Sequence, residues 1–306
     1  GNRPAPPPHA RTDGVRRSTP RRSATMNYQY FFTRANEPTN RIQFATTPPH
    51  LAGAGDFRHI TQALRSAGWK NHSAPDYPHV ILASPDYASS LVLEPGARSD
   101  ALAWRLRGHT DGRSWHAAFD GNLPVEILAG FTDALIRPAP SEPPETWALL
   151  TQAGWSYERD DHGSEQSVHP DGTARVLRYA DTDHRPWQAE ASNPHGLGGR
   201  HIWRAYIDQA TPPHLTAGFL TALATDRPLQ RGMGDVPHTH LVTQERTGPQ
   251  AEQLAAAHRQ RLADARTAAR RIRRATTPET QLHTASAPPR SAARCATPGT
   301  HPTRKI

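Results

Sequence analysis

The sequence has almost no cysteine: one residue, Cys295, among 306. A single cysteine excludes an internal disulfide framework and a cysteine-ligated zinc site. Long apolar runs are missing too, since none reaches the roughly 18 residues typical of a transmembrane helix. The Pro- and Arg-rich start is not followed by the apolar core of a signal peptide. We therefore expect a cytoplasmic protein without a membrane partner.

Apolar residues are also scarce, at 35% of a chain that contains 30 Pro and 21 Gly. A chain of this composition does not bury one large core over its whole length, so part of it should lack structure. The first segment, 1–25, and the last, 275–306, consist mainly of Pro, Arg, Ser, Thr and Ala. We predict that both are disordered basic tails.

The net charge of +8 is unevenly distributed along the chain. Residues 1–22 contain six Arg and one acid, residues 245–274 contain eight Arg and three acids, and residues 275–306 contain four basic residues and one acid. The intervening segment, 23–244, contains 18 basic and 23 acidic residues. Any attraction to nucleic acid should therefore come from the ends of the chain.

What the chain does contain is a duplication. The segment from Trp115 to Leu135 recurs 88 positions later, from Trp203 to Leu223, with nine identical positions. An earlier Gly-Trp pair at 68–69 likewise recurs at 154–155. We infer that one small fold was copied, and that the two copies occupy residues 44–140 and 141–228.

Each copy shows the same order of local signals. Apolar residues at helical spacing end at a glycine, segments of alternating hydrophobicity follow, and a proline then opens a second helix. Each unit thus predicts a helix, about four antiparallel strands and a helix. The fold class is α+β: two repeats of a small antiparallel sheet flanked by helices. Whether the repeats share one sheet stays open at this point.

Two further segments follow the repeats. Residues 229–249 are rich in Pro, Gly, His and Thr, and we predict a linker. Residues 250–274 contain no Pro or Gly and are rich in Ala, Leu, Gln and Arg, which predicts a basic helix. Its apolar stripe is mostly Ala, too weak for a stable coiled coil on its own.

Four landmarks occur in order: HLAGAGDFRHI at 50–60, the Gly-Trp pair, the tetrapeptide Ser84-Pro85-Asp86-Tyr87, and PVEILAGFTDAL at 124–135. Together they resemble the SPDY-motif domain family, a domain of unknown function found in actinobacterial proteins, often in tandem. The second copy has His169-Pro170-Asp171-Gly172 in place of the tetrapeptide. This departure favours a turn over a catalytic role for the motif.

The candidate catalytic and metal-binding residues have simpler structural interpretations. Asp86 and Asp171 follow a proline and predict turns, although paired carboxylates also perform acid–base chemistry. Asp120 and Asp208 predict loop or capping positions. The pairs His238/His240 and Asp181-Thr-Asp183-His184 lack the spacing of a zinc motif. We therefore assign no catalytic residue, no metal site and no cofactor, and we expect three tryptophans in the core: Trp104, Trp115 and Trp203.

The strongest functional signal is a cluster of four arginines near the end of the basic helix: Arg270, Arg271, Arg273 and Arg274. Cations there complement the helix dipole, and clustered Arg also characterises nucleic-acid binding. The leading hypothesis is a non-enzymatic tandem-repeat interaction module with weak, non-specific nucleic-acid binding through its basic ends. The alternatives are a purely protein-binding module with inert tails, or an enzyme with a cleft between the repeats.

Overall fold

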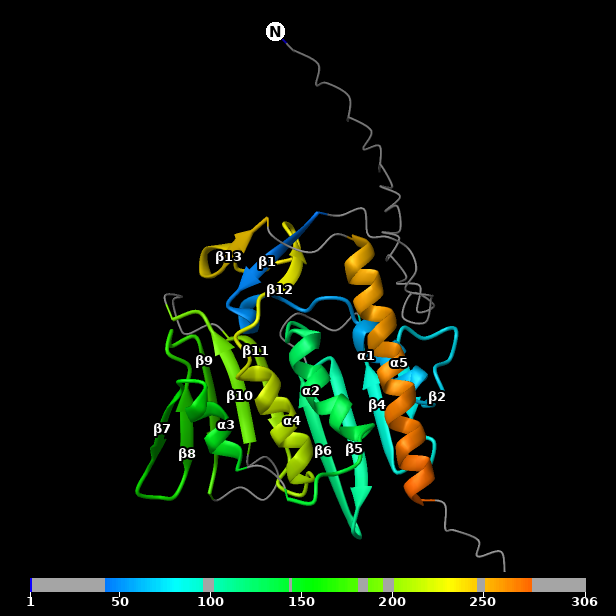
Figure 1. The fold of residues 1–306 in the computed structure, drawn as a ribbon. Coiled ribbons are helices and arrows are strands. Elements are labelled where there is room, and N and C mark those ends of the chain that lie inside the picture. The colour runs from blue at the N-terminus through cyan, green and yellow to red at the C-terminus, as the bar shows by residue number, and fades with distance from the viewer. Residues whose placement is uncertain are drawn as a thin grey trace, which may run out of the picture.

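The structure is a computed structural model that describes residues 1, 42–95, 102–142, 145–180, 187–194, 201–246 and 251–276. The tails predicted to be disordered fall almost entirely outside these ranges. None of the helices within them combines the length and hydropathy that a bilayer-crossing segment needs. The fold is α+β, as the sequence predicts, with helices laid over one face of a large antiparallel sheet (Figure 1).

Both repeats contribute to a single ten-stranded sheet with the order β2-β3-β4-β5-β6-β11-β10-β9-β8-β7. The first repeat supplies β2 (Lys70–Asn71), β3 (Val80–Ala83), β4 (Ser89–Leu93), β5 (Trp104–Thr110) and β6 (Arg113–Phe119). The second supplies β7 (Ser156–Arg159), β8 (Glu165–Val168), β9 (Ala174–Arg178), β10 (Trp187–Ser192) and β11 (His201–Ile207). In the described residues each repeat therefore has five strands, one more than the sequence predicts. The additional strands are the outermost ones, β2 and β7, which are short and polar.

The two repeats meet symmetrically where β6 pairs with β11. The register joins Ala118 to Tyr206, and these positions differ by the repeat offset of 88. Ala117 pairs with Ile207 and Phe119 with Ala205, so each flanking pair is the image of the other. An approximate twofold axis therefore passes through the pair formed by Ala118 and Tyr206.

The helices form a second layer with the same symmetry (Figure 1). Helix α2 (Val125–Leu135) of the first repeat packs against α4 (Pro213–Leu223) of the second, and α1 (Arg58–Ser66) and α3 (Thr146–Gln152) flank them. The central pair cross at Gly130 and Gly218, which are also 88 positions apart. A Cβ on either glycine would overlap the backbone of the other, so the close approach requires glycine at both.

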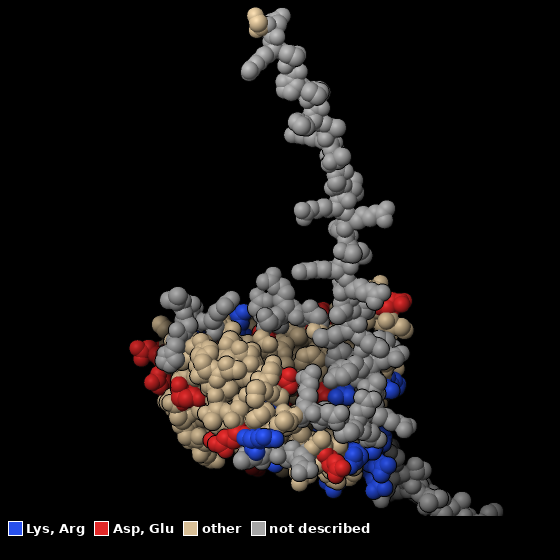
Figure 2. All heavy atoms as spheres, turned by 90° about the horizontal axis from the view of Figure 1, so that it is seen from above, with Lys and Arg blue, Asp and Glu red and all other residues tan. Residues whose placement is uncertain are grey.

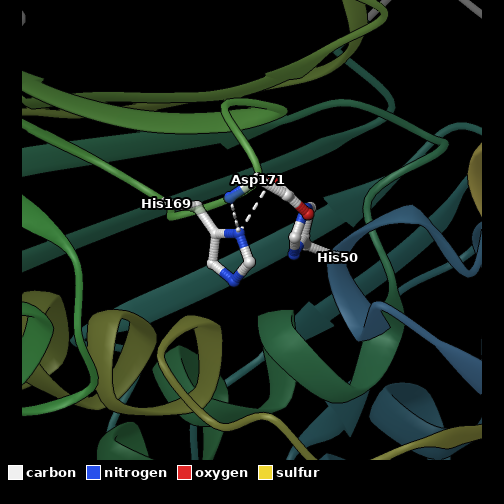
Figure 3. A group of neighbouring side chains, drawn as sticks. All are labelled: His50, His169 and Asp171. Atoms are coloured by element: carbon white, nitrogen blue, oxygen red, sulfur yellow. Dashed lines mark hydrogen bonds and ion pairs between the residues drawn. The ribbon is translucent and has the colours of Figure 1, made fainter.

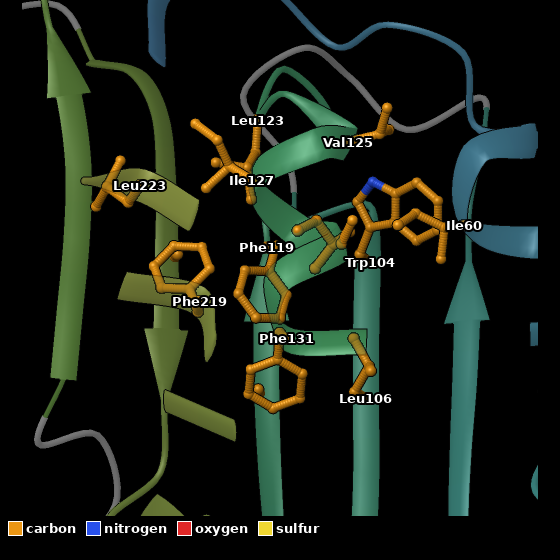
Figure 4. Close-up of a cluster of buried hydrophobic side chains, with 14 of the residues drawn as sticks. Ile60, Trp104, Leu106, Phe119, Leu123, Val125, Ile127, Phe131, Phe219 and Leu223 are labelled. Atoms are coloured by element: carbon orange, nitrogen blue, oxygen red, sulfur yellow. The ribbon is translucent and has the colours of Figure 1, made fainter. Parts of the chain in front are cut away.

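The core lies between the sheet and this helical layer and runs continuously through both repeats (Figure 4). Phe119 of the first repeat contacts Phe219 of the second, with ring centroids 5.5 Å apart, and it also contacts Phe131. The three tryptophans predicted to be in the core are buried: Trp104, Trp115 and Trp203. The copies thus share one core, which compensates for the low apolar content of each.

A small three-stranded sheet, β12-β1-β13, lies beside the main sheet and joins the two ends of the folded body. Strand β1 (Gln43–Thr47) pairs with both β12 (Leu229–Gly232) and β13 (Thr243–Glu245). The segment 229–249, predicted to be a linker, therefore contains two strands. Arg231 ties it to the body: its guanidinium is buried and donates to the Glu126 carboxylate at 2.6 and 2.9 Å.

Helix α5 (Ala251–Thr276) corresponds to the predicted basic helix. It packs against α1 of the first repeat (Figure 1). Ala265 and Ala269 are buried in this contact and Leu262 is partly buried. The alanine stripe, too weak for a coiled coil on its own, thus forms the apolar part of the contact between α5 and the first repeat. The second repeat has no described helix in the corresponding position.

Candidate functional site

The four arginines singled out in the sequence lie on the last turns of α5. All four side chains, Arg270, Arg271, Arg273 and Arg274, are exposed. In Figure 2, Lys and Arg gather at the corner of the body where the described chain ends. Among the described residues, none forms an ion pair with Arg270, Arg271 or Arg274. These three arginines therefore form a cationic surface that the described part of the body does not neutralise.

Polar contacts fix the orientation of α5. Arg261 donates to both oxygens of the Asp133 carboxylate, at 2.7 and 2.8 Å, and to the carbonyl of His59 at 3.0 Å. His258 lies 2.7 Å from the amide oxygen of Gln62. A bidentate Arg–carboxylate pair adds geometric specificity as well as energy. Because one face of α5 is held in this way, its remaining arginines occupy defined positions on the surface.

The tetrapeptide of the first repeat is a turn between β3 and β4, as the sequence predicts. The Asp86 carboxylate accepts from the Ser84 hydroxyl at 2.6 Å and from the Ala88 amide at 3.0 Å. Partial burial alone would raise the pKa of Asp86, but these hydrogen bonds outweigh it and lower the pKa. Tyr87 has a φ of 60°, and Gly172 at the matching position of the second repeat has 73°.

The second pair of carboxylates is placed by the twofold symmetry. Asp120 accepts from the amide of Asn122 at 2.8 Å, and Asp208 accepts from the amide of Ala210 at 3.1 Å. Both are loop residues that hold a turn, as predicted. Asp208 also lies 2.8 Å from His116. The strand register places Asp86 and Asp120 at opposite ends of the first repeat, so the structure does not bring these two carboxylates together.

One group of potential metal ligands does come together, in the turn between β8 and β9 (Figure 3). His169 and Asp171 belong to this turn, and His50 reaches it from the 3₁₀ helix Pro49–Leu51. Burial lowers the pKa of His50 to about 4. Partial burial would raise the pKa of Asp171, but hydrogen bonds from His169 and Thr173 hold it well below its ordinary value.

The other histidines considered from the sequence give no such grouping in the described ranges. The rings of His238 and His240 are 6.2 Å apart, edge to face. The segment 181–184 lies outside the described residues. Sequence reasoning did not find the cluster at His50, because that residue precedes Asp171 by 121 positions. The only local signal was the replacement of Ser84 by His169 at the same turn position.

The fold defines this chain as a tandem-repeat α+β protein, in which two symmetry-related units share one sheet and one core. Comparison with protein families identifies the units. The sequence model of SPDY, described as a domain of unknown function (DUF317), matches residues 83–141 and 169–229. The chain therefore contains two tandem SPDY segments, as its motifs indicated. Comparisons with curated proteins and with solved structures found no significant match.

Proposed function

We propose that this protein is a non-enzymatic tandem SPDY module that binds nucleic acid weakly and without sequence preference through the exposed face of α5. The observation that carries the proposal is the combination of a basic helix with a fixed attachment. Arg261 and Asp133 hold one side of the helix on the first repeat. The arginines on its other sides face solvent.

The spacing of these arginines supports a contact with a phosphate backbone. Exposed arginines recur along α5 at intervals of seven, four and three residues: Arg259, Arg266, Arg270 and Arg273. Such intervals place the side chains along one stripe of the helix. At 1.5 Å per residue the stripe is about 21 Å long. Guanidinium groups along such a stripe would neutralise several successive phosphates and release their counterions.

The charge of the rest of the chain supports the same location. Residues 23–244, which contain both repeats, have five more acidic than basic residues. A body of that sign repels a polyanion, whereas the cationic end of α5 attracts it. The tails, which carry further arginines, lie outside the described residues and would extend the same attraction.

The test measures binding of the full chain to a mixed-sequence DNA duplex by fluorescence anisotropy over a range of salt concentrations. We expect log K to fall linearly with log salt, by about 0.9 for each phosphate contacted. Replacement of Arg270, Arg271, Arg273 and Arg274 by Gln should weaken binding at least about 10-fold and flatten the salt slope. The matched control replaces four exposed arginines elsewhere: Arg107, Arg113, Arg159 and Arg227.

The two quadruple variants lose the same net charge, so a difference between them reports position rather than total charge. Equal weakening by both would contradict a specific role for α5. Deletion of residues 1–25 and 277–306 then separates the helix from the tails. If the intact chain shows no salt-sensitive binding at all, the protein-binding alternative replaces this proposal, and a pull-down with residues 44–228 is the next experiment.

A further inference from the structure

The second repeat contains a polar cluster that the first repeat lacks. In the first repeat, the turn between β3 and β4 is closed by the Ser84 hydroxyl. In the second, His169 replaces Ser84, and its Nδ1 lies 2.8 Å from the Asp171 carboxylate. His50, from the start of the first repeat, brings a second imidazole to the same carboxylate. Since Ser84 suffices to make the turn, the turn itself does not require the histidines.

The ligand atoms of the three residues lie close enough to share one ion. One ligand atom from each of the three residues lies within 4.8 Å of the other two. The distance from His50 Nε2 to Asp171 Oδ2 is 3.7 Å. Bonds of about 2.0–2.1 Å in a tetrahedral site place ligand atoms about 3.3 Å apart. The spacings of 2.8 Å from His169 Nδ1 to Asp171 Oδ1 and of 3.7 Å from His50 Nε2 to Asp171 Oδ2 lie on either side of that value.

Neighbouring groups hold these ligands in orientation. The amide and hydroxyl of Thr173 donate to Asp171 Oδ1, at 2.8 and 2.6 Å, which turns Oδ2 toward His50. The indole of Trp203 donates to the carbonyl of His50 at 2.7 Å. The ring of Trp155 meets His169 edge to face at 5.1 Å. Such outer partners are a regular feature of metal sites, where they fix carboxylate and imidazole directions.

The exposed fraction of the side chain increases from His50 to His169 to Asp171. The side chain of His50 is 1% exposed, that of His169 is 21% exposed, and that of Asp171 is 34% exposed. An ion would thus enter from the side of His169 and Asp171, whose side chains reach solvent, and not past His50. Two imidazoles and one carboxylate suit zinc and related divalent transition metals better than calcium or magnesium, which prefer oxygen ligands.

We propose that His50, His169 and Asp171 bind one divalent transition-metal ion, with Zn²⁺ as the reference probe, and that the ion fastens the start of the first repeat to the second repeat. Without an ion, the Thr173 hydroxyl donates to Asp171, so His50 Nε2–H donates to Thr173 Oγ1 at 2.6 Å. On binding, each imidazole carries its proton on the other ring nitrogen. The nitrogen that faces the carboxylate then presents its lone pair to the ion.

The experiment titrates tag-free, chelator-treated full-length protein with Zn²⁺ by calorimetry, and with Co²⁺ by visible absorption. We expect one tight site per chain and the absorption bands of a cobalt ion with low coordination number. His169→Ser restores the residue of the first repeat and should preserve the turn. It and Asp171→Asn should each weaken binding by at least about 100-fold, because even outer-shell partners are worth about 10- to 100-fold.

Two further variants distinguish the loss of a metal ligand from a general loss of folding. Thr173→Val changes an outer partner only and should weaken Zn²⁺ binding by about 10-fold. His162→Ala removes an exposed histidine from the turn between β7 and β8 and should leave binding unchanged. Circular dichroism should show the fold of each variant intact. The proposal is overturned if Zn²⁺ binds no more tightly to the wild type than to His169→Ser, or if no binding is detected.

Discussion

The two repeats have the same strand order but different outer edges. In the first repeat, Val80 of β3 pairs with Leu93 of β4, and both are fully buried. The strand register places Glu165 and Arg178 at the matching positions of the second repeat, where they form an ion pair of 3.5 Å. An apolar pair has thus become a polar one. At the first edge α1 is covered in turn by α5, whereas α3 covers the second edge.

The difference continues inward from the edge. Leu82 in β3 is fully buried, and the matching residue in β8 is Ser167, which is buried but polar. Trp104 in β5 is fully buried, whereas Trp187 in β10 is partly exposed and lies under the guanidinium of Arg178. The first repeat therefore carries more of the hydrophobic stabilisation, and the second relies on the shared centre. The following predictions test that comparison.

The largest expected effect is at a buried strand position where one repeat has an apolar side chain and the other a polar one. Leu82→Ala should lower the free energy of unfolding by about 3–5 kcal/mol, because it removes buried methyl groups and leaves a cavity. Ser167→Ala should cost only about 1 kcal/mol, since it removes one hydrogen bond to the Ser156 carbonyl. Urea unfolding of both variants measures the difference. Equal losses would show that the two edges contribute equally.

The next effect concerns the contact that the repeats share. Gly130→Ala should destabilise the protein by about 2–3 kcal/mol, because its Cβ would overlap the backbone of α4. Symmetry predicts a similar loss for Gly218→Ala. The control is Gly234→Ala, where a Cβ meets nothing within 4 Å. Thermal unfolding compares the three, and a mild effect at either helical glycine would mean that α2 and α4 are not closely packed.

The attachment of α5 should contribute less. Arg261→Met keeps most of the apolar stem but removes the pair with Asp133. We expect hydrogen-exchange protection of α5 to fall by about 2 kcal/mol, the range of hydrogen bonds to charged groups. Arg266→Met, on the exposed side of the same helix, should change nothing. Equal protection in both variants would show that the alanine stripe alone holds α5.

The same interface predicts a dependence of stability on pH. Burial, with the Arg261 charge next, lowers the pKa of His59 to about 4, against the opposing effects of Glu126 and Asp133; His258 faces it from α5. In the unfolded chain His59 binds a proton below about pH 6.5, whereas in the folded chain it does so only near pH 4. The contribution of His59 to the free energy of unfolding is therefore constant above pH 6.5 and falls as the pH drops toward 4. The slope is at most about 1.4 kcal/mol per pH unit. Urea unfolding midpoints at pH 7 and pH 5 measure this slope. The variant His59→Gln should show a smaller slope than the wild type. An unchanged slope would mean that other groups cause the pH dependence.

The smallest effect is expected at the polar edge of the second repeat. Glu165→Gln removes one charge of the pair with Arg178, whose side chain is 47% exposed. Surface ion pairs contribute about 0–1 kcal/mol, and salt screens them. The unfolding free energy should therefore change by less than about 1 kcal/mol, and by less still at high salt. A larger loss would mean that this edge depends on the pair as the first edge depends on Val80 and Leu93.

Much of this architecture follows from local patterns. Alternating residues predicted the inner strands, and the offset of 88 predicted the symmetry-related helices. The outer strands β2 and β7 were missed because they are two and four residues long and wholly exposed, so no alternation marks them. The strands within 229–249 were missed for a related reason: pairing with β1, not their own composition, makes them strands.

The candidate sites divide in the same way. The turn roles of Asp86 and Asp171 were predictable, since proline and aspartate favour turns by themselves. The docking of α5 depends on Arg261 and Asp133, which are 128 positions apart. No local pattern encodes such a pairing. The cluster at His50 has the same origin, because a short 3₁₀ helix places it against a turn of the second repeat.

Ala118 and Tyr206 occupy the same position in the two repeats, and they pair with each other. In the unit that was duplicated, this position would therefore lie opposite its own copy. Two separate copies that met through this strand would form a closed isologous homodimer, whose two faces must be identical. Fusion into one polypeptide removes that constraint, because each half then mutates independently. Alanine and tyrosine now occupy what was a single self-complementary position. A gene that encodes both halves can thus specialise one of them for attachment and leave the other free.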